Sequence, residues 1–200
     1  MMVKISPGNS KMGVIPSVSL PSGVTCRNDC ECIKLCYGRK IERLRPSVRK
    51  TYQQNLELLR KHPETFWREV EATVMTSRFF RFHVSGDIPD ADYFRNMCGI
   101  ASRQPHCQIL CFTKKYEIVN GYLASGEEIP DNLHVIFSGW RYLKMDNPYN
   151  LPEAHVLYKD GTTTANESAV LCTGNCTNCA RQNGGCWSLK PGQQILLKQH

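Results

Sequence analysis

The stretch from residue 79 to residue 140, FFRFHVSGDIPDADYFRNMCGIASRQPHCQILCFTKKYEIVNGYLASGEEIPDNLHVIFSGW, decides the fold class. It holds three short apolar runs, at 79–84, 107–112 and 133–137, and each run ends in small or polar residues. Apolar residues at helical spacing follow the first two runs, at 90–103 and 116–124. Short strands that alternate with helices at this spacing are typical of parallel βα units.

The flanking sequence extends this pattern. We predict a short strand at 14–20 that runs into a loop, and two helices over 41–75 that are separated at His62–Pro63. Further strands are expected at 154–158 and 194–198. The predicted fold class is α/β, built as a partial parallel (βα) barrel or an open parallel sheet. Its core spans 1–168, and a Cys-rich metal-binding tail, 169–200, packs on that core.

The composition excludes several protein classes. Of the 200 residues 41% are hydrophobic and 22% are charged, which fits a folded globular chain and disfavours disordered, collagenous and coiled-coil proteins. No apolar run approaches the ~20 residues that a membrane span requires. The first residues, MMVKISPGNSKMG, lack the apolar segment of a secretion signal. We therefore expect a cytoplasmic protein with no membrane partner.

Cysteine is unusually frequent, with 11 residues in the chain. In a reducing compartment, clustered cysteines are more often metal ligands than disulfides. The tail has four of them within a stretch rich in Gly, Asn and Thr that holds almost no aliphatic residues, so we expect a bound metal to organise it. Four thiolates can hold either a tetrahedral zinc ion or an iron–sulfur cluster, and the sequence leaves both open. The four tail cysteines are Cys172, Cys176, Cys179 and Cys186.

A second set lies in the loop after the first predicted strand, with the spacing Cys26-x3-Cys30-x1-Cys32-x3-Cys36. This spacing fits no common zinc motif. We take Cys26, Cys32 and Cys36 as the preferred ligands, and the role of Cys30 stays open. Three ligands leave one coordination position free for chemistry, whereas structural sites are usually closed. The alternative is that this loop and the tail together bind one structural metal.

The other cysteines, Cys98, Cys107 and Cys111, fall within a helical apolar face and an apolar run. Free cysteine behaves in such places as a small hydrophobic residue, so we expect them in the core.

Several short segments resemble a known family. They resemble a phage-encoded family known as gene product eighty-eight, over nearly the whole chain. The resemblance implies a bacteriophage origin, hence an infected host cell, and a metal-rich pattern, but no established activity. The segments are Asn9-Ser10-Lys11, Ser19-Leu20-Pro21, Cys32-x3-Cys36-Tyr37, Phe82-His83-Val84-Ser85-Gly86-Asp87, Thr113-Lys114 and Cys186-Trp187.

The order of the motifs is also similar to that of radical S-adenosylmethionine enzymes, although the first cysteine set departs from their usual Cys-x3-Cys-x2-Cys spacing. This resemblance implies one or two 4Fe–4S clusters and bound S-adenosylmethionine. It implies that Ser85, Gly86 and Asp87 hold the amino group of the cofactor and that Lys114 faces its anionic end. The implied function is redox or radical chemistry at the carboxyl ends of the strands, where ligands bind in parallel α/β proteins.

The polar candidates have ordinary alternatives. His83 is expected on the face opposite to Phe82, either facing a cluster or hydrogen-bonded in the core. Asp87 could instead cap the helix that begins near residue 89, and Lys114 could be a solvated residue. The C-terminal His200 is either a further metal ligand or a frayed end.

A different function is indicated by charge. The net charge is +7, and residues 39–50 hold six positive charges and one negative charge. Such a segment can lie along a nucleic-acid backbone, or it can be a solvated helix face. The alternative function is therefore a non-enzymatic, zinc-stabilised phage protein that binds nucleic acid or a host partner.

Overall fold

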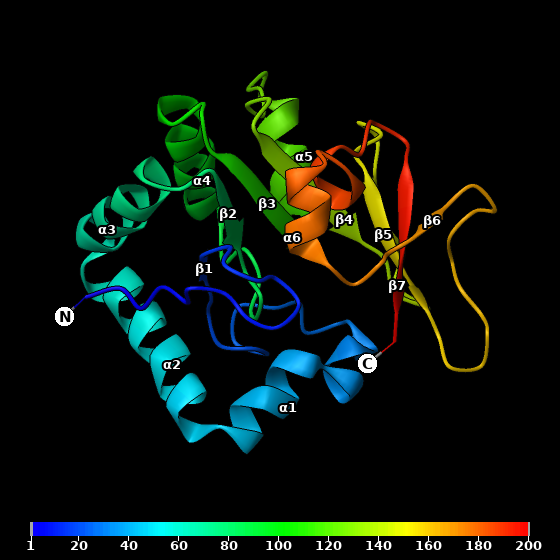
Figure 1. Cartoon of the computed structure of the whole chain (residues 1–200), viewed down its shortest axis with the longest axis horizontal. Helices are drawn as coiled ribbons and strands as arrows, with labels where there is room; N and C mark the ends of the chain where they lie inside the picture. Colours follow the sequence, from blue (N-terminus) through cyan, green and yellow to red (C-terminus); the bar gives the residue numbers. More distant parts are fainter. Residues whose placement is uncertain (1, 200) are drawn as a thin grey trace.

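The computed structural model describes residues 2–199, and its centre is one seven-stranded sheet (Figure 1). The strand order is β1-β2-β3-β4-β5-β7-β6, and every neighbouring pair is parallel. The strands are β1 (Ser17–Val18), β2 (Phe79–Phe82), β3 (Gln108–Thr113), β4 (Leu133–Ser138), β5 (Glu153–Leu157), β6 (Val170–Leu171) and β7 (Gln194–Lys198). The α-helices are α1 (Tyr37–Leu44), α2 (Pro46–Lys61), α3 (Pro63–Met75), α4 (Ala91–Arg103), α5 (Tyr116–Ala124) and α6 (Cys176–Arg181), and two 3-10 helices span Glu31–Leu35 (η1) and Gly185–Trp187 (η2).

The sheet is open. Over residues 2–199, β6 pairs only with β7, and β1 pairs with β2 and has one isolated antiparallel bridge to Ser6 on its other side. The predicted α/β class and the open parallel sheet are thus confirmed. Curvature into a partial barrel stays a prediction.

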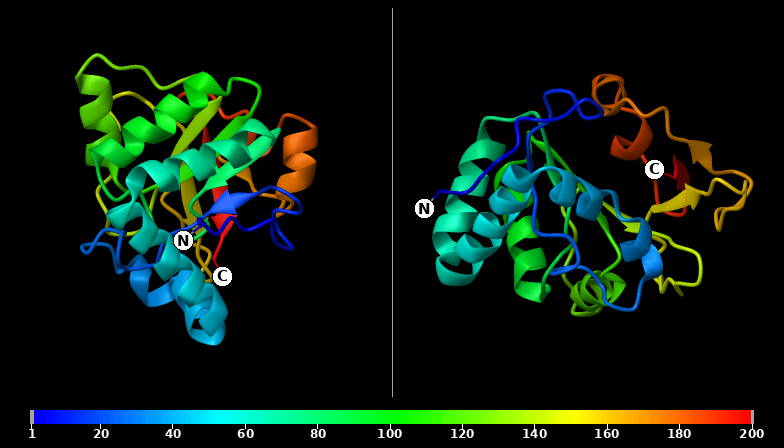
Figure 2. Two further views of the ribbon diagram at one scale, coloured as in Figure 1. Left: turned by 90° about the vertical axis from the view of Figure 1, so that its left-hand side faces the viewer. Right: turned by 90° about the horizontal axis from the view of Figure 1, so that it is seen from below.

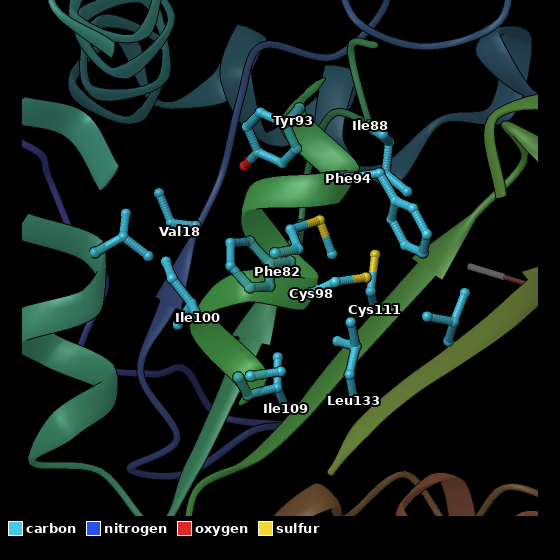
Figure 3. Close-up of a cluster of buried hydrophobic side chains, with 14 of the residues drawn as sticks. Val18, Phe82, Ile88, Tyr93, Phe94, Cys98, Ile100, Ile109, Cys111 and Leu133 are labelled. Atoms are coloured by element: carbon cyan, nitrogen blue, oxygen red, sulfur yellow. The ribbon is translucent and has the colours of Figure 1, made fainter. Parts of the chain in front are cut away.

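The helices between the first strands cover one face of the sheet. Strands β1 to β4 follow one another in chain order, and right-handed crossovers then place the connecting helices on the same side. Phe82 of β2 and Ile109 of β3 pack there against α4 (Figure 3). Figure 3 also shows Cys98 and Cys111 within this apolar layer. The predicted core positions of Cys98, Cys107 and Cys111 are confirmed, since each is at most 3% exposed.

The tail covers the opposite face, where Leu110 and Ile136 form a second apolar cluster with Trp187. The Trp187 ring lies 5.1 Å from that of Phe79 and is only 3% exposed. The tail therefore contributes one large apolar side chain, Trp187, to this cluster, although it holds almost no aliphatic residues. Because β7 lies between β5 and β6, residues from 169 onward also share the sheet with the rest of the chain. The division into a core and a tail domain stays a prediction.

The N-terminal segment holds the tail helix in place. The Thr177 hydroxyl donates to the Met12 carbonyl at 2.9 Å, and the Cys176 N–H donates to the Lys11 carbonyl at 3.0 Å. A Cβ on Gly13 would lie 2.0 Å from the Thr177 hydroxyl oxygen, so only glycine permits this approach. Figure 2 shows the N-terminal segment beside α6 in both views. The tail is thus anchored through contacts that are distant in sequence.

Several elements differ from the prediction in number or in length. The region 41–75 belongs to three helices rather than two, because a new helix begins at Pro46. Proline is tolerated at the first position of a helix, since an N–H there would have no partner within the helix. The predicted break at Pro63 is confirmed. The strand expected at 14–20 is reduced to two residues beside Pro16, and β6, α6 and η2 were not predicted. Within the described residues no helix is long and apolar enough to cross a membrane.

Asn132 stabilises the end of α4. Its side-chain amide donates to the carbonyl oxygens of Ala101, Gln104 and Cys107, at 2.8 to 3.1 Å. Asn132→Ala should lower the free energy of unfolding by about 1–3 kcal/mol, because it leaves buried carbonyl groups without a donor. Urea denaturation measures this change. The exposed Asn96, which donates to one carbonyl on its own helix, provides the control Asn96→Ala, which should stay within about 0.5 kcal/mol of the wild type.

Candidate functional site

The loop that carries the first cysteine set is bound to the carboxyl ends of the first strands. The Leu20 N–H donates to the Ser85 carbonyl at 3.1 Å, just before this loop begins. Within the loop, the Thr25 hydroxyl accepts from the Asp87 N–H at 3.0 Å. The sequence-predicted residues at the ends of β2 and β3 therefore lie beside the cysteine loop.

Asp87 joins the ends of two strands. Its carboxylate accepts from the Thr113 hydroxyl at 2.6 Å, from the Lys114 N–H at 2.9 Å and from the Ile88 N–H at 2.8 Å. Burial raises the pKa of Asp87, and these donors partly offset the rise. The alternative role as a helix cap is wrong, because Asp90 caps α4 by accepting from the backbone of its third residue.

Ser85 and Gly86 fix the neighbouring backbone. The Ser85 hydroxyl donates to Oε1 of the buried Glu42 at 2.9 Å. The Ser22 N–H donates to the same Glu42 oxygen, also at 2.9 Å. Gly86 has a φ of 81°, and a Cβ there would lie 2.8 Å from the Leu20 carbonyl oxygen, so glycine is required. In this structure the Ser-Gly-Asp segment holds the cysteine loop and α1. Its role in binding an amino group stays a prediction.

The four loop cysteines are free thiols with two different environments. Cys30 is 3% exposed, and its sulfur accepts from the Cys32 N–H at 3.4 Å as the N-cap of η1. Cys26, Cys32 and Cys36 are half-buried, and Cys26 lies close enough to interact electrostatically with both of the others. Burial raises the pKa of Cys26, and the nearby Lys114 lowers it. Cys30 belongs to the same region, because its side chain also hydrogen-bonds to the Cys32 thiol, which with Lys114 lowers the pKa of Cys30 to about 6. All four loop thiols therefore lie together beside Lys114.

Lys114 connects this region to the tail. Its ammonium group interacts electrostatically with Cys26 and Cys32, and it donates to the Ser138 hydroxyl at 3.0 Å. Ser138 lines a cavity of about 380 Å³ between the sheet and the tail. Lys114 therefore has a protein partner and is not simply solvated.

All four tail cysteines line this cavity, which we call the tail cavity, together with Arg81, Phe112 and Lys11. Burial raises the pKa of the Cys186 thiol to about 12. Burial also raises the pKa of Cys176, whereas Arg81 and Lys11 lower it. Within residues 2–199 no three Cys, His, Asp or Glu side chains are arranged closely enough to hold a single metal ion.

Arg81 is the site residue that the sequence pattern did not identify. It lies in the aromatic strand β2 and points away from Phe82, into the tail cavity. Its guanidinium lies 4.9 Å from the centre of the Phe112 ring, and its Nε is buried without a hydrogen-bond partner. Within the described chain no carboxylate pairs with it. Burial lowers the pKa of Arg81, and thiolates at Cys176 and Cys186 would raise it.

His83 lies on the helix-covered face and not opposite to Phe82, so that prediction is wrong. The strand ends at Phe82, and His83 has a φ of 57°, which turns its ring toward α4. There its Nε2 is 3.0 Å from the Tyr93 hydroxyl, and its Nδ1 has no partner. The alternative of a hydrogen-bonded core histidine is thus confirmed. His200 lies outside the described residues.

The buried His83 makes stability depend on pH. Burial lowers the pKa of His83 from 6.5 to about 3, so the unfolded state binds more protons between these values. The contribution of neutral His83 to the free energy of unfolding is therefore complete above pH 6.5, and it is lost as the pH falls from 6.5 toward 3. From pH 7 to pH 5 the wild type should lose about 2 kcal/mol more than His83→Asn, which tolerates the positive φ. Urea denaturation at several pH values measures this difference, and the exposed His62 provides the control His62→Asn.

Comparisons with known proteins agree with the phage resemblance. Residues 4–186 match the family model described as Gene product 88. A similar curated protein is the "Gene 88 protein" of Mycobacterium phage L5, which is 27% identical over 181 residues, covering 84% of this chain and 72% of the relative. No solved structure gives a significant match. Because the family model spans most of the sequence, including both cysteine sets, the chain belongs to the Gene product 88 family.

Proposed function

We propose that this phage protein is an iron–sulfur protein with one cluster in the cysteine loop and a second in the tail. The loop cluster would be held by Cys26, Cys32 and Cys36. The observation that carries the proposal is the environment of Arg81, a cation that faces the tail cysteines without a carboxylate partner. The tail cluster would be held by Cys172, Cys176, Cys179 and Cys186.

The charge of Arg81 supports an anionic group in the tail cavity. A buried cation is costly unless an anion compensates it. Four neutral thiols offer no such charge, whereas four thiolates around a dipositive metal centre carry two net negative charges. Arg81 and Lys11 both line the cavity, so they would balance that charge.

The size of the tail cavity favours a cluster over a zinc ion. Zinc–sulfur bonds of about 2.3 Å bring tetrahedral thiolates to about 3.8 Å from one another. The described cysteines are not gathered around a single-ion position, and together with residues of the sheet they line a cavity of about 380 Å³. A cubane cluster attaches its thiolates at separate iron corners, so it suits a wider ring of ligands.

The loop would serve a different purpose from the tail. Three ligands leave one iron open to a substrate or cofactor, and this iron would supply redox chemistry at the carboxyl ends of the strands. In that site the chain itself holds the loop through Asp87 and Ser85 and places a positive charge at Lys114. Adenosylmethionine binding at Ser85, Gly86, Asp87 and Lys114 remains the prediction of the resemblance, because Ser85 and Asp87 already have protein partners.

The test is anaerobic purification of the full chain, followed by an optical spectrum and by iron, zinc and sulfide analysis of one sample. A brown protein with broad visible absorption and about equal iron and acid-labile sulfide supports the proposal. Colourless protein with zinc and no sulfide, also after attempted cluster reconstitution, would overturn it. If iron is found, reduction in the presence of added S-adenosylmethionine tests for its cleavage.

The second candidate is a zinc-stabilised protein that binds nucleic acid. It is favoured by the basic residues of 39–50, of which none forms an ion pair within the described chain. This candidate predicts stoichiometric zinc and nucleic-acid binding that weakens steeply with salt. It gives no role to the half-buried Cys26, Cys32 and Cys36.

A further inference from the structure

We infer that a cavity between the cysteine loop and helices α1 and α2 binds a phosphate-bearing ligand of the size of a nucleotide. This cavity, which we call the basic cavity, has a volume of about 690 Å³ and is distinct from the tail cavity. Small-molecule sites generally measure ~300–1,000 Å³. The inference does not depend on the presence of a cluster.

One wall of the basic cavity is cationic. Arg39, Lys40 and Arg43 of α1 and Arg49 of α2 line it, and all are exposed. None of these side chains has an ion-pair or hydrogen-bond partner within residues 2–199, so their charges are free to meet a ligand. A fifth cation, Lys34, lines the cavity but pairs with Glu31. Arginine forks match the oxygen geometry of phosphate.

The only carboxylate among the described lining residues, Glu42, is directed away from that wall. Its Oε1 accepts from the Ser22 N–H and from the Ser85 hydroxyl. Ser22 also lines the cavity, and its hydroxyl oxygen is buried beneath the cavity surface without a partner.

The cysteine loop contributes apolar residues to the same cavity. Val24, Ile33 and Leu35 line it, and Val24 and Leu35 are more than half exposed. A lining that combines cationic and apolar side chains fits an anion with a flat or apolar group attached. A nucleotide has this combination, since its phosphates carry charge and its base has two flat faces. Free inorganic phosphate would use only the cationic wall.

The position of the basic cavity relates it to the cysteine loop. Cys36 lines the cavity, and its sulfur accepts from the Arg39 N–H. A ligand there would lie next to the loop that we propose as the site of chemistry, on the side of α1.

The test is calorimetric titration of the full-length purified protein with ATP, inorganic phosphate and a ten-nucleotide oligothymidylate. The variant Arg39→Gln/Arg43→Gln removes two charges from the cavity. The matched control, Arg45→Gln/Lys50→Gln, removes two charges from the same segment at exposed positions that do not line it. We expect ATP to bind the cavity variant at least about tenfold more weakly than the wild type and the control within about twofold. We expect phosphate alone to bind more weakly than ATP.

Three results would overturn the inference. The first is that ATP does not bind the wild type. The second is that the two double variants weaken ATP binding equally. The third is that oligothymidylate binds much more tightly than ATP and that both double variants reduce this binding alike. The last two would indicate diffuse attraction along the segment. All four substituted residues are exposed, so an unchanged melting temperature confirms folding, and the iron content of each sample tests the cluster proposal separately.

Discussion

The double variant Cys176→Ser/Cys186→Ser should lose the metal of the tail and, with it, much of the stability of the chain. Metal binding by thiolates contributes directly to folding where the apolar core is small. Here the site lies beside Trp187, which is packed on the sheet, so loss of the metal also releases apolar contacts. We expect a loss on the order of 5 kcal/mol, or about 10–20 °C in Tm, and about half of the iron.

The control for the tail variant is a cysteine pair in the apolar core. Cys98 and Cys107 are both buried in the apolar cluster on the helix-covered side of the sheet. Neither of them lines the tail cavity. The variant Cys98→Ala/Cys107→Ala should therefore lose stability through small cavities while it keeps its full iron content. Iron analysis on anaerobically purified protein, with thermal melts on the same samples, separates the two effects. Full iron content in the tail variant would contradict the tail site.

The central βα units were predictable because their signals are local. The strands β2, β3 and β4 carry apolar residues on both faces, with Arg81 and His134 as exceptions toward the tail, and they are bounded by residues that favour turns. The α4 helix has both its N-cap, Asp90, and an apolar stripe. These elements accordingly lie within one or two residues of the predicted ranges.

The tail was less predictable because its structure depends on distant contacts. The two residues of β6, Val170 and Leu171, are largely exposed and form a strand only by pairing with β7. Helix α6 has six residues, too few to be stable alone, and it is held by Lys11 and Met12. Contacts between residues so distant in sequence leave no periodic pattern.

The candidate site was predictable in its position and less so in its contacts. The carboxyl ends of parallel strands meet at one edge, so Asp87 and Lys114 were expected together, and they are in contact. The sequence pattern did not identify Arg81 because it is a single charged residue within an apolar run, and the run was assigned to a buried strand as a whole. Strict alternation along β2 would have separated it from Phe80 and Phe82 and placed it on the tail side.

Substitutions in the cysteine loop should show which of its four thiols bind iron. Cys32→Ala and Cys36→Ala should each lower the iron content from about eight to about four atoms per chain, because each removes one of three ligands. If three thiolates hold the loop cluster as proposed, Cys30→Ser should keep about eight, because serine can also cap η1 and hydrogen-bond to Cys32. Iron and sulfide analysis, together with the visible spectrum, measures this difference.

The contrast between Cys30 and the other loop cysteines decides whether the loop site is open. If Cys30→Ser loses as much iron as Cys32→Ala, the loop holds a closed four-thiolate site, and chemistry at a free iron position is excluded. If only the three half-buried thiols matter, one iron lacks a protein ligand and is available to a substrate or cofactor. The fold itself should survive each substitution, because the Asp87 N–H holds the loop at Thr25 and the Ser85 hydroxyl holds α1 at Glu42, with no sulfur involved. Retained melting temperature with lost iron would therefore assign these sulfurs to the metal and not to the fold.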